Sequence, residues 1–414
     1  MGFRDFFYRR CGKKCNFLRG ELPFPLRKEE AIFRFADRGR EKGAIQNIFL
    51  RSLMAKTLLF YISGHGFGHV TREIEVMKSL LRRDAQIRIV VKTDAPAWFF
   101  HLNLPESRVT LIPESCDVGV VQNDSFRANR KKTLETFARF YLDFNKRVPS
   151  EVHLVRENGV DLIVGDIAPL AFDVSRAAGV PGIAVANFSW DWIYEPYVTD
   201  APELGWVIPV LKMIYGKADA LLRLPLHGDL SAFPNPRDIS FIARKAVLPR
   251  DEVRRKLEAK GRSGRKIGLI SLRAEDLKRI SLSALEKITD FQFFVFAPVP
   301  TMPNVFSLPP DFLPYQELVQ AADVVISKPG YGIVSECLAN RTPLLFTSRE
   351  DFREYDVLAE GILKMKAGVF LPQTDFFAGQ WASALKTVPD LQGKWVQPSV
   401  TGAEEAASII LKEF

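Results

Sequence analysis

The sequence is poor in cysteine and has no long apolar run. Its four cysteines, Cys11, Cys15, Cys116 and Cys337, are too scattered for a disulfide framework and favour a reducing cytoplasm. Cys11 and Cys15 have no second pair that would complete a zinc site. Without a run of about 18 apolar residues, no transmembrane helix is expected. Hydrophobic residues make up 47% of the chain and charged residues 26%, which excludes a mainly disordered protein.

The positive net charge is concentrated at the beginning of the chain. Residues 1–53 hold most of the surplus of Lys and Arg, so the remainder is close to neutral and no nucleic-acid partner is expected. One interpretation makes 1–53 an extension, or a misassigned start, that is poorly ordered and dispensable for folding. The other makes it a basic, aromatic-rich arm that contacts a membrane surface or a nucleic acid. The first is favoured, with a cytoplasmic location, and the second would make the protein peripheral to a membrane.

From Thr57 onward, short apolar runs alternate with segments of helical periodicity. Runs that are apolar at nearly every position indicate strands covered on both faces. The alternation therefore predicts a parallel sheet with helices on both of its faces. The expected strands are 57–63, 86–92, 108–112, 161–165, 181–186 and 219–223. The expected helices are 70–83, 129–147 with its end near Pro149, and 203–216.

A second alternating region follows a proline-rich stretch at 224–240, which is interpreted as an interdomain linker. Its expected strands are 266–272, 291–296, 323–327, 343–346 and 367–371, and a last helix is expected at 402–412. The predicted fold class is α/β, with two Rossmann-like domains whose parallel sheets face each other across a cleft. The expected domains are 54–230 and 231–400, between the extension 1–53 and a C-terminal segment 401–414.

A glycine-rich motif directly follows the first expected strand, with the sequence Ser63-Gly-His-Gly-Phe-Gly-His-Val-Thr-Arg72. Glycines at 64, 66 and 68 let the backbone approach a ligand closely. His69 stands at the start of a helix, where the positive end of the helix dipole disfavours imidazolium, and a neutral imidazole suits a general base. The alternative for His69 is a residue that only caps the turn. For His65, ligand contact and loop packing remain equally open.

A second glycine motif follows the strand at 323–327 and reads Ser327-Lys-Pro-Gly-Tyr-Gly-Ile-Val-Ser-Glu336. A glycine loop before a helix N-terminus is a ready cradle for a diphosphate. Glu336 lies off the apolar face of that helix, so it is expected to face solvent. It can accept hydrogen bonds from a ribose diol, or it is simply an acid stabilised by the helix dipole.

Polar and aromatic residues follow other strands of the expected first sheet. Asp166 closes an apolar strand, where an unpaired carboxylate is costly, so a partner is expected. Asn187, Trp190 and Asp191 follow the next strand. Trp190 fits either stacking on a sugar ring or packing in the core. In the second half, the charged segment 348–355 begins a helix at a strand's carboxyl end. Its charged side chains either bind sugar hydroxyls or form a solvent-exposed helix start.

Taken together, these motifs resemble the GT-B glycosyltransferases, in particular the group that includes the peptidoglycan N-acetylglucosaminyltransferase. Gly64–His69 and the segment Asn187-Phe-Ser-Trp-Asp-Trp-Ile-Tyr194 are also similar to the glycosyltransferase-like N-terminal region of L-arabinokinases. The resemblance covers about residues 54–395. It implies a nucleotide-sugar donor, with a UDP-sugar expected, a hydroxyl acceptor, inverting transfer, and neither a metal nor another cofactor.

Roles for individual residues come partly from the resemblance, which implies those of His69, Asn187, Gly330, Gly332, Glu336, Arg353 and Glu354. The other residues below are assigned from their places in the glycine loop or after strand ends. Catalysis is assigned to His69 as the base, with Asp166 and Asp191 as the carboxylates to test next. Donor binding is assigned to Gly330, Gly332, Glu336, Arg273, Arg353 and Glu354. Acceptor binding is assigned to His65, Gly66, Gly68, Asn187 and Trp190.

Two positions depart from the pattern of this family. Arg273 follows the first strand of the second half, where glycines are usual, and either supplies charge to a phosphate or marks a degraded site. Arg341 replaces the usual helix-ending glycine, so Asn340 is expected to adopt the left-handed conformation. No sugar-kinase domain follows, so kinase activity is not expected. The rival functions are a non-catalytic module that binds sugars or nucleotide sugars, and a nucleotide-sugar epimerase.

Overall fold

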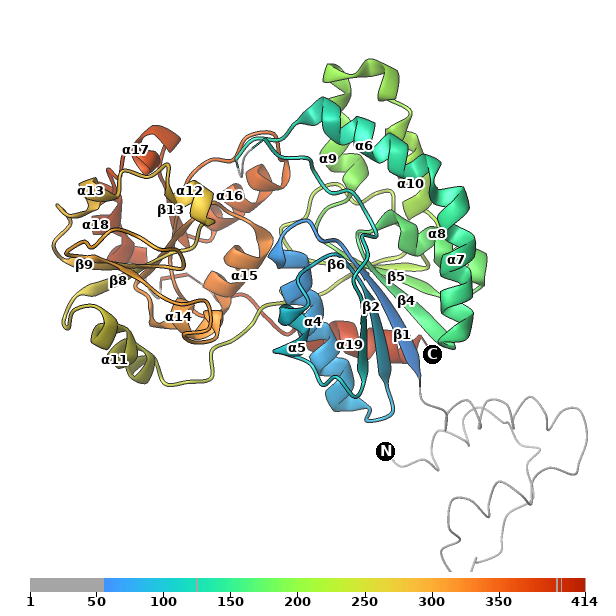
Figure 1. Ribbon diagram of the computed structural model, residues 1–414, viewed down its shortest axis with the longest axis horizontal. Coiled ribbons are helices and arrows are strands. Elements are labelled where there is room, and N and C mark those ends of the chain that lie inside the picture. Colours follow the sequence, from blue (N-terminus) through green and yellow to red (C-terminus); the bar gives the residue numbers. More distant parts are fainter. Residues whose placement is uncertain (1–55, 124–125, 392–393, 396, 414) are drawn as a thin grey trace, which may run out of the picture. The chain divides into compact units, whose positions relative to one another are not determined.

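The computed structural model describes residues 56–123, 126–391, 394–395 and 397–413. The interpretations of 1–53 lie outside these residues. Thirteen strands form two parallel sheets within the described part of the chain, as the alternating pattern predicts (Figure 1). No helix among the described residues is long and apolar enough to cross a membrane.

The first sheet has the strand order β3-β2-β1-β4-β5-β6-β7, and all of its pairings are parallel. Its strands are β1 (Thr57–Ile62), β2 (Arg88–Lys92), β3 (Val109–Ile112), β4 (Val160–Asp166), β5 (Gly182–Ala186), β6 (Ala220–Arg223) and β7 (Pro236–Asp238). Every residue of β1 is buried, because helices cover both faces of the sheet. The chain order reverses between β1 and β4, and ligands bind in such sheets at the carboxyl ends beside this point.

Helices cover both faces of the first sheet (Figure 1). They are α4 (Phe67–Arg83), α5 (Trp98–His101), α6 (Arg130–Leu142), α7 (Phe144–Glu157), α8 (Pro169–Ala178), α9 (Trp190–Tyr194) and α10 (Val207–Tyr215), with 3₁₀ turns η2 (Glu195–Asp200) and η3 (Pro202–Leu204). Helix α8 packs on β4 and contacts α7 and α10, whereas α4 contacts α5.

The second sheet has the order β10-β9-β8-β11-β12-β13, again entirely parallel. Its strands are β8 (Lys266–Ile270), β9 (Phe291–Val295), β10 (Val305–Ser307), β11 (Val324–Ser327), β12 (Leu344–Phe346) and β13 (Gly368–Phe370). Its helices are α11 (Arg250–Lys260), α12 (Ala274–Leu277), α13 (Leu282–Leu285), α14 (Tyr315–Ala321), α15 (Tyr331–Ala339), α16 (Glu354–Lys364), α17 (Gln373–Phe377) and α18 (Ala382–Leu391). Here the order reverses between β8 and β11, immediately before the second glycine motif.

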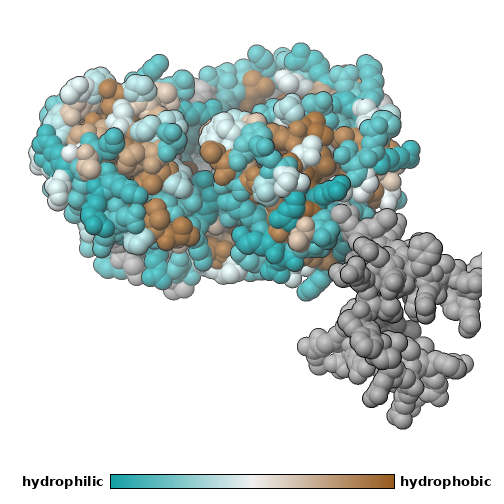
Figure 2. All heavy atoms as spheres, turned by 60° about the horizontal axis from the view of Figure 1, so that its bottom comes forward, coloured by the Kyte–Doolittle hydropathy of each residue, from teal (hydrophilic) through white to brown (hydrophobic). Residues whose placement is uncertain are grey.

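The last helix, α19 (Gly402–Lys412), returns to the first half and packs against α4 (Figure 1). Its buried alanines let the two helices approach closely. Figure 2 shows one face of the molecule, on which hydrophobic residues gather in separate patches among hydrophilic ones.

Three local expectations are wrong. Pro149 does not end a helix: α6 ends at Leu142, and Pro149 lies inside α7. The stretch 224–240 is not only a linker, because β7 forms within it and pairs with β6. At the end of α15, Arg341 rather than Asn340 has the left-handed conformation, with φ of 57°. Asn340 instead uses its side chain, which donates to the carbonyl oxygens of Arg244 and Glu336.

Candidate active site

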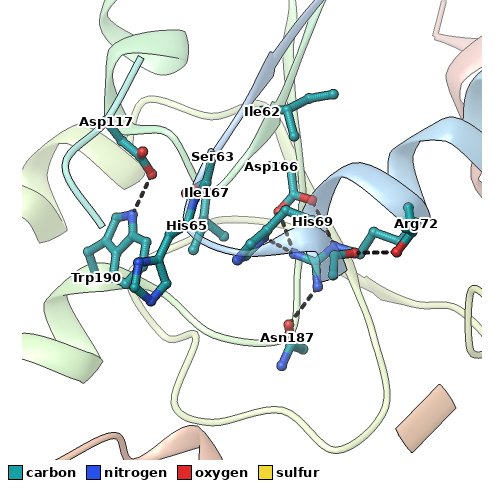
Figure 3. Close-up of polar contacts among 12 residues, drawn as sticks. Ile62, Ser63, His65, His69, Arg72, Asp117, Asp166, Ile167, Asn187 and Trp190 are labelled. Atoms are coloured by element: carbon teal, nitrogen blue, oxygen red, sulfur yellow. Dashed lines mark hydrogen bonds and ion pairs between the residues drawn. The ribbon is translucent and has the colours of Figure 1, made fainter. Parts of the chain in front are cut away.

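The centre of the first half is a buried cluster of charged side chains at the carboxyl ends of β1 and β4 (Figure 3). The loop after β1 leads through Gly66, whose φ of 90° favours glycine, into α4. His69, the third residue of α4, is buried, and its Nδ1 lies 2.9 Å from Oδ1 of Asp166, the last residue of β4. The structure therefore brings together two of the three predicted catalytic residues, and Asp166 has the expected partner.

Arg72 completes this pair from the next turn of α4. Its Nε donates to Asp166 Oδ2 at 2.7 Å, and its Nη2 donates to Asp166 Oδ1. Burial raises the pKa of the Asp166 carboxyl, but Arg72 and His69 outweigh burial and hold this pKa at about 2. Asp166 is therefore a carboxylate at neutral pH and accepts from its neighbours.

These partners distinguish the two tautomers of a neutral His69 ring. Nδ1 lies 2.9 Å from a carboxylate oxygen and 3.0 Å from Arg72 Nη2. A carboxylate can only accept, and the Arg72 guanidinium already donates to Asp166, so we assign the Nδ1 proton to the bond with Asp166. This tautomer leaves Nε2 unprotonated, which is the form that a general base requires.

The same arginine links the first half to the second. Arg72 Nη1 donates to Asn187 Oδ1 at 2.7 Å, and Asn187 Nδ2 donates to Glu354 Oε1 at 2.8 Å. All three residues are buried. Asn187 and Glu354, which the resemblance assigns to acceptor and donor respectively, thus lie in one hydrogen-bonded chain with the candidate base.

His65 and Trp190 lie beside this cluster (Figure 3). His65 Nδ1 accepts from the Val120 N–H, and its ring lies edge-on to Trp190 with centroids 5.5 Å apart. Burial, followed by the charge of Arg349, lowers the pKa of His65 well below its ordinary value, so His65 is neutral at pH 7. Trp190 is buried in the core, and its Nε1 donates to Asp117 Oδ2 at 2.9 Å.

Asp191, the third predicted catalytic residue, does not join the cluster. It is buried near the start of α9, and no hydrogen bond or ion pair among the described residues connects it to His69 or Asp166. Burial raises its pKa, and the charges that act on it include those of Lys212 and Asp229.

The two glycine motifs meet at their backbones. A Cβ atom built on Gly332 would lie 3.1 Å from the Cα of Gly68, so each glycine permits the close approach of the other. Helices α4 and α15, which begin at these motifs, contact each other. Gly330 is the residue before α15, and an added Cβ there would meet nothing within 4 Å. The structure thus places Gly68 and Gly332 in a contact between the two halves.

Glu336 differs from its expected exposed position. It is 4% exposed and accepts from Arg244 Nε at 2.5 Å, because the chain after β7 runs beside α15. Burial raises the pKa of Glu336, while Arg244 acts in the opposite direction. The crevice around this pair is too narrow to hold a water molecule. Thr71 and Arg72 of α4 line it together with Arg244 and Glu336.

The other predicted donor residues have separate surroundings. Arg353 donates to the Trp192 carbonyl oxygen at 2.8 Å and to Glu195 at 2.7 Å. Arg273 is exposed at the start of α12, and its charge acts on His65 and Arg349. Among the described residues, no group of three or more His, Cys, Asp or Glu side chains is arranged to hold a metal ion.

Sequence reasoning assigned no role to Arg72, Arg244 or Asp117. Arg72 lies three residues after His69 and therefore on the same face of α4, so helical spacing carried a signal for it. Asp117 and Arg244 lie in irregular segments, so no helical or strand periodicity in the sequence predicts that they lie near the end of a strand. Burial raises the pKa of Asp117 to about 6, although the hydrogen bonds that its carboxylate accepts act to lower this pKa.

No family model matches this sequence. An L-arabinokinase of Arabidopsis thaliana is 28% identical over 378 residues, which cover 87% of this chain and 35% of that protein. This chain thus spans about a third of the length of that relative. An uncharacterised glycosyltransferase of Methanopyrus kandleri is 25% identical over 306 residues, which cover 65% of this chain and 80% of the relative.

Solved structures are similar over nearly the whole described fold. A glycotransferase of kitacinnamycin matches with a TM-score of 0.58 and 15% identity, covering 86% of this chain and 99% of its own. The calicheamicin glycosyltransferase CalG4 matches with a TM-score of 0.57 and 15% identity, covering 87% and 98%. At this level of identity the likeness establishes the fold. The chain therefore has the GT-B fold, and its resemblance to the GT-B glycosyltransferases is confirmed.

Proposed function

We propose that this protein transfers a sugar from a nucleotide-diphosphate donor to a hydroxyl group of an acceptor. The observation that carries the proposal is the buried His69–Asp166 pair at the point where the first sheet reverses its strand order. Arg72 and Asn187 connect this pair to Glu354 of the second half. The name of the Methanopyrus kandleri relative and the GT-B fold support the same reaction class.

On the acceptor side, His69 acts as the general base. Its Nδ1–H donates to Asp166, so Nε2 takes the proton of the acceptor hydroxyl as that oxygen attacks the anomeric carbon. Asp166 then stabilises the imidazolium that forms, without taking the proton itself. A single displacement of this kind inverts the configuration at the anomeric carbon. The leaving group is the nucleoside diphosphate, whose terminal phosphate oxygen receives the electrons of the broken bond.

On the donor side, the beginning of α15 binds the diphosphate. The unpaired N–H groups after Gly330 and the positive end of the helix dipole favour an anion there. Lys328 and Arg273 follow β11 and β8 respectively, and add positive charge beside the point where the second sheet reverses its order. The proposal places the stabilisation of the leaving group on these residues and assigns no step to a metal ion.

Glu336 binds the ribose diol in this proposal, but only after it exchanges partners. Its carboxylate is engaged by Arg244, and the crevice around the pair is too narrow for a nucleoside. Donor binding therefore requires Arg244 and α4 to withdraw from α15.

A second candidate is a module that binds a nucleotide sugar without transferring it. The observation that favours it is the engagement of donor-side residues by protein groups: Glu336 by Arg244, and Arg353 by Trp192 and Glu195. A site in which these contacts are permanent would not accept a complete donor.

The test is an assay of the full chain with a panel of UDP-, dTDP- and GDP-sugars and hydroxyl acceptors. Because one relative is an L-arabinokinase, the panel includes UDP-L-arabinose as a donor and L-arabinose as an acceptor. Transfer predicts release of the nucleoside diphosphate that depends on the acceptor, with inverted anomeric configuration of the product by NMR. Binding without release favours the module, and a changed sugar on an intact nucleotide indicates an epimerase.

A further inference from the structure

Glu73 is a buried carboxyl group without a hydrogen-bond partner beside the candidate base. It follows Arg72 on α4 and lies one helical turn after His69. Its side chain is 0% exposed, and neither of its carboxyl oxygens has a hydrogen-bond partner among the described residues. A buried carboxylate without a partner is costly, so such a group is normally neutral and uses its proton in a hydrogen bond.

Asp166 is the acceptor that remains within reach of Glu73. His69 and Arg72 both contact Asp166 from one face of α4, and Glu73 shares that face because it lies four residues after His69. Asp166 Oδ1 accepts hydrogen bonds from His69 Nδ1 and Arg72 Nη2, whereas Oδ2 accepts one only from Arg72 Nε. A carboxylate has about four lone-pair sites, so one position on Oδ2 remains open.

We propose that Glu73 is a positioning residue: a neutral carboxylic acid whose O–H donates to Asp166 and fixes the carboxylate that holds His69. The inference rests on the proposed role of His69 as a base. With Glu73 neutral, the charge of Asp166 is balanced by that of Arg72. An ionised Glu73 would repel Asp166 and turn it away from the imidazole.

The surroundings of Glu73 favour its neutral, protonated form. Burial raises the pKa of Glu73 well above its ordinary value, Asp166 raises it further, and Arg72 acts in the opposite direction. Helix α15 contributes Tyr331, whose ring centre lies 5.5 Å from the Arg72 guanidinium carbon. Helix α19 also packs on α4, but its Glu404 contacts Arg82 and Arg83 at the far end of that helix.

Thermal and denaturant unfolding against pH tests the protonation without any substrate. The folded state retains a proton on Glu73 at pH values where the unfolded chain has released it, so stability falls as pH rises above about 4.5. Relative to Glu73→Gln, whose amide donates without titrating, the unfolding equilibrium constant of the parent should rise up to tenfold per pH unit. Glu75→Gln is the control, because Glu75 lies on the same helix and pairs with Lys78 at a partly exposed site. Parallel curves for the parent and Glu73→Gln would overturn the proposal.

Turnover tests the positioning role once a donor and an acceptor are known. Glu73→Gln should keep the parent's kcat at pH 7 and keep it as pH rises, while the kcat of the parent falls as Glu73 ionises. Glu73→Leu removes the donor and should lower kcat by about tenfold to a hundredfold with little change in KM. Equal kcat for Glu73→Leu and the parent would overturn the positioning role. Absence of transfer by the parent would contradict the proposed function, while the unfolding experiment would still decide whether Glu73 carries a proton.

Discussion

The two glycine motifs occupy equivalent places in their sheets, yet their surroundings differ. In the first half, His69 finds Asp166 across the point where the strand order reverses, and both are buried in one hydrogen-bonded cluster. In the second half, the motif after β11 contributes backbone to a contact with Gly68, and Glu336 is bound by Arg244 from the irregular segment after β7. The first site is assembled, whereas the second must exchange partners to receive a ligand.

The two sites also differ in the partners of their buried carboxylates. Asp166 keeps its negative charge because Arg72 and His69 pair with it inside the protein. Glu336 is also paired, but its partner Arg244 lies on an irregular segment rather than within a helix or strand. The predictions below test this contrast, from the largest expected effect to the smallest.

The largest effect is expected for His69→Ala. Removal of a general base should lower turnover by roughly 100- to 10,000-fold at pH 7. Affinity for the nucleoside diphosphate should change little, because the nucleotide is assigned to the second half. Steady-state kinetics measures the turnover, and calorimetry on the same preparation measures the affinity for the nucleoside diphosphate. The matched control is His153→Ala, since His153 is exposed on α7 and should leave turnover unchanged. A variant that retains most of its turnover would remove the base role from His69.

Asp166→Asn should destabilise the first half by about 3–5 kcal/mol. The buried Arg72 loses its counter-charge, and the amide NH2 group of the asparagine faces the N–H groups of Arg72 and His69, which are donors as well. The pKa of about 2 in the folded state lies below the unfolded value, so Asp166 stabilises the parent above about pH 4. That contribution is lost as pH falls toward 2. Denaturant unfolding at pH 7 and pH 3 should therefore show a smaller difference between parent and variant at the lower pH. A difference independent of pH would contradict the ionised pair.

Asp117 should show the opposite pH dependence from Asp166. Its pKa is about 6 in the folded protein, above the unfolded value of about 3.8, so the parent loses stability as pH rises between these values. Between pH 4 and pH 7, the stability of Asp117→Asn relative to the parent should rise by about 2.4 kcal/mol. Chemical unfolding at both pH values measures this change. A constant difference would mean that Asp117 is ionised throughout.

The smallest effect is expected for Glu336→Gln. A charged hydrogen bond to a ribose diol contributes roughly 1.5–3 kcal/mol, so nucleotide affinity should fall about tenfold or more. Because Glu336 is buried and paired with Arg244, the variant should also lose some stability, contrary to the expectation for an exposed position. Calorimetry and thermal unfolding separate the two losses. Glu360→Gln, at an exposed position of α16, is the control. Unchanged affinity would leave Glu336 with a structural role only.

The arrangement of the fold follows from sequence patterns that act locally. Buried parallel strands such as β1 and β4 are apolar throughout, and the turns between them carry glycine and proline. Strands β7 and β10 have three residues each, and the β7 residues Pro236–Asp238 are exposed, so no apolar run marked them. Pro149 was expected to end a helix, but the chain already turns at Asp143, which ends α6 and precedes α7.

The candidate site was predictable where backbone position alone determines proximity. The carboxyl ends of β1 and β4 are adjacent in this topology, so the meeting of His69 with Asp166 follows from the strand order. The partners of Glu336 and Arg353 were not predictable, because Arg244 and Glu195 come from an irregular segment and a 3₁₀ turn. Their positions depend on tertiary packing, which carries no period in the sequence.

The central claim is that Asp166 holds His69 with a proton on Nδ1 and leaves Nε2 available as the base. Nitrogen NMR of the protein labelled at histidine, with the His69 signal assigned through His69→Ala, measures the tautomer directly at pH 7 without any substrate. The account predicts protonated Nδ1 and unprotonated Nε2. Unprotonated Nδ1, accepting from Arg72 while Nε2 carries the proton, would contradict it.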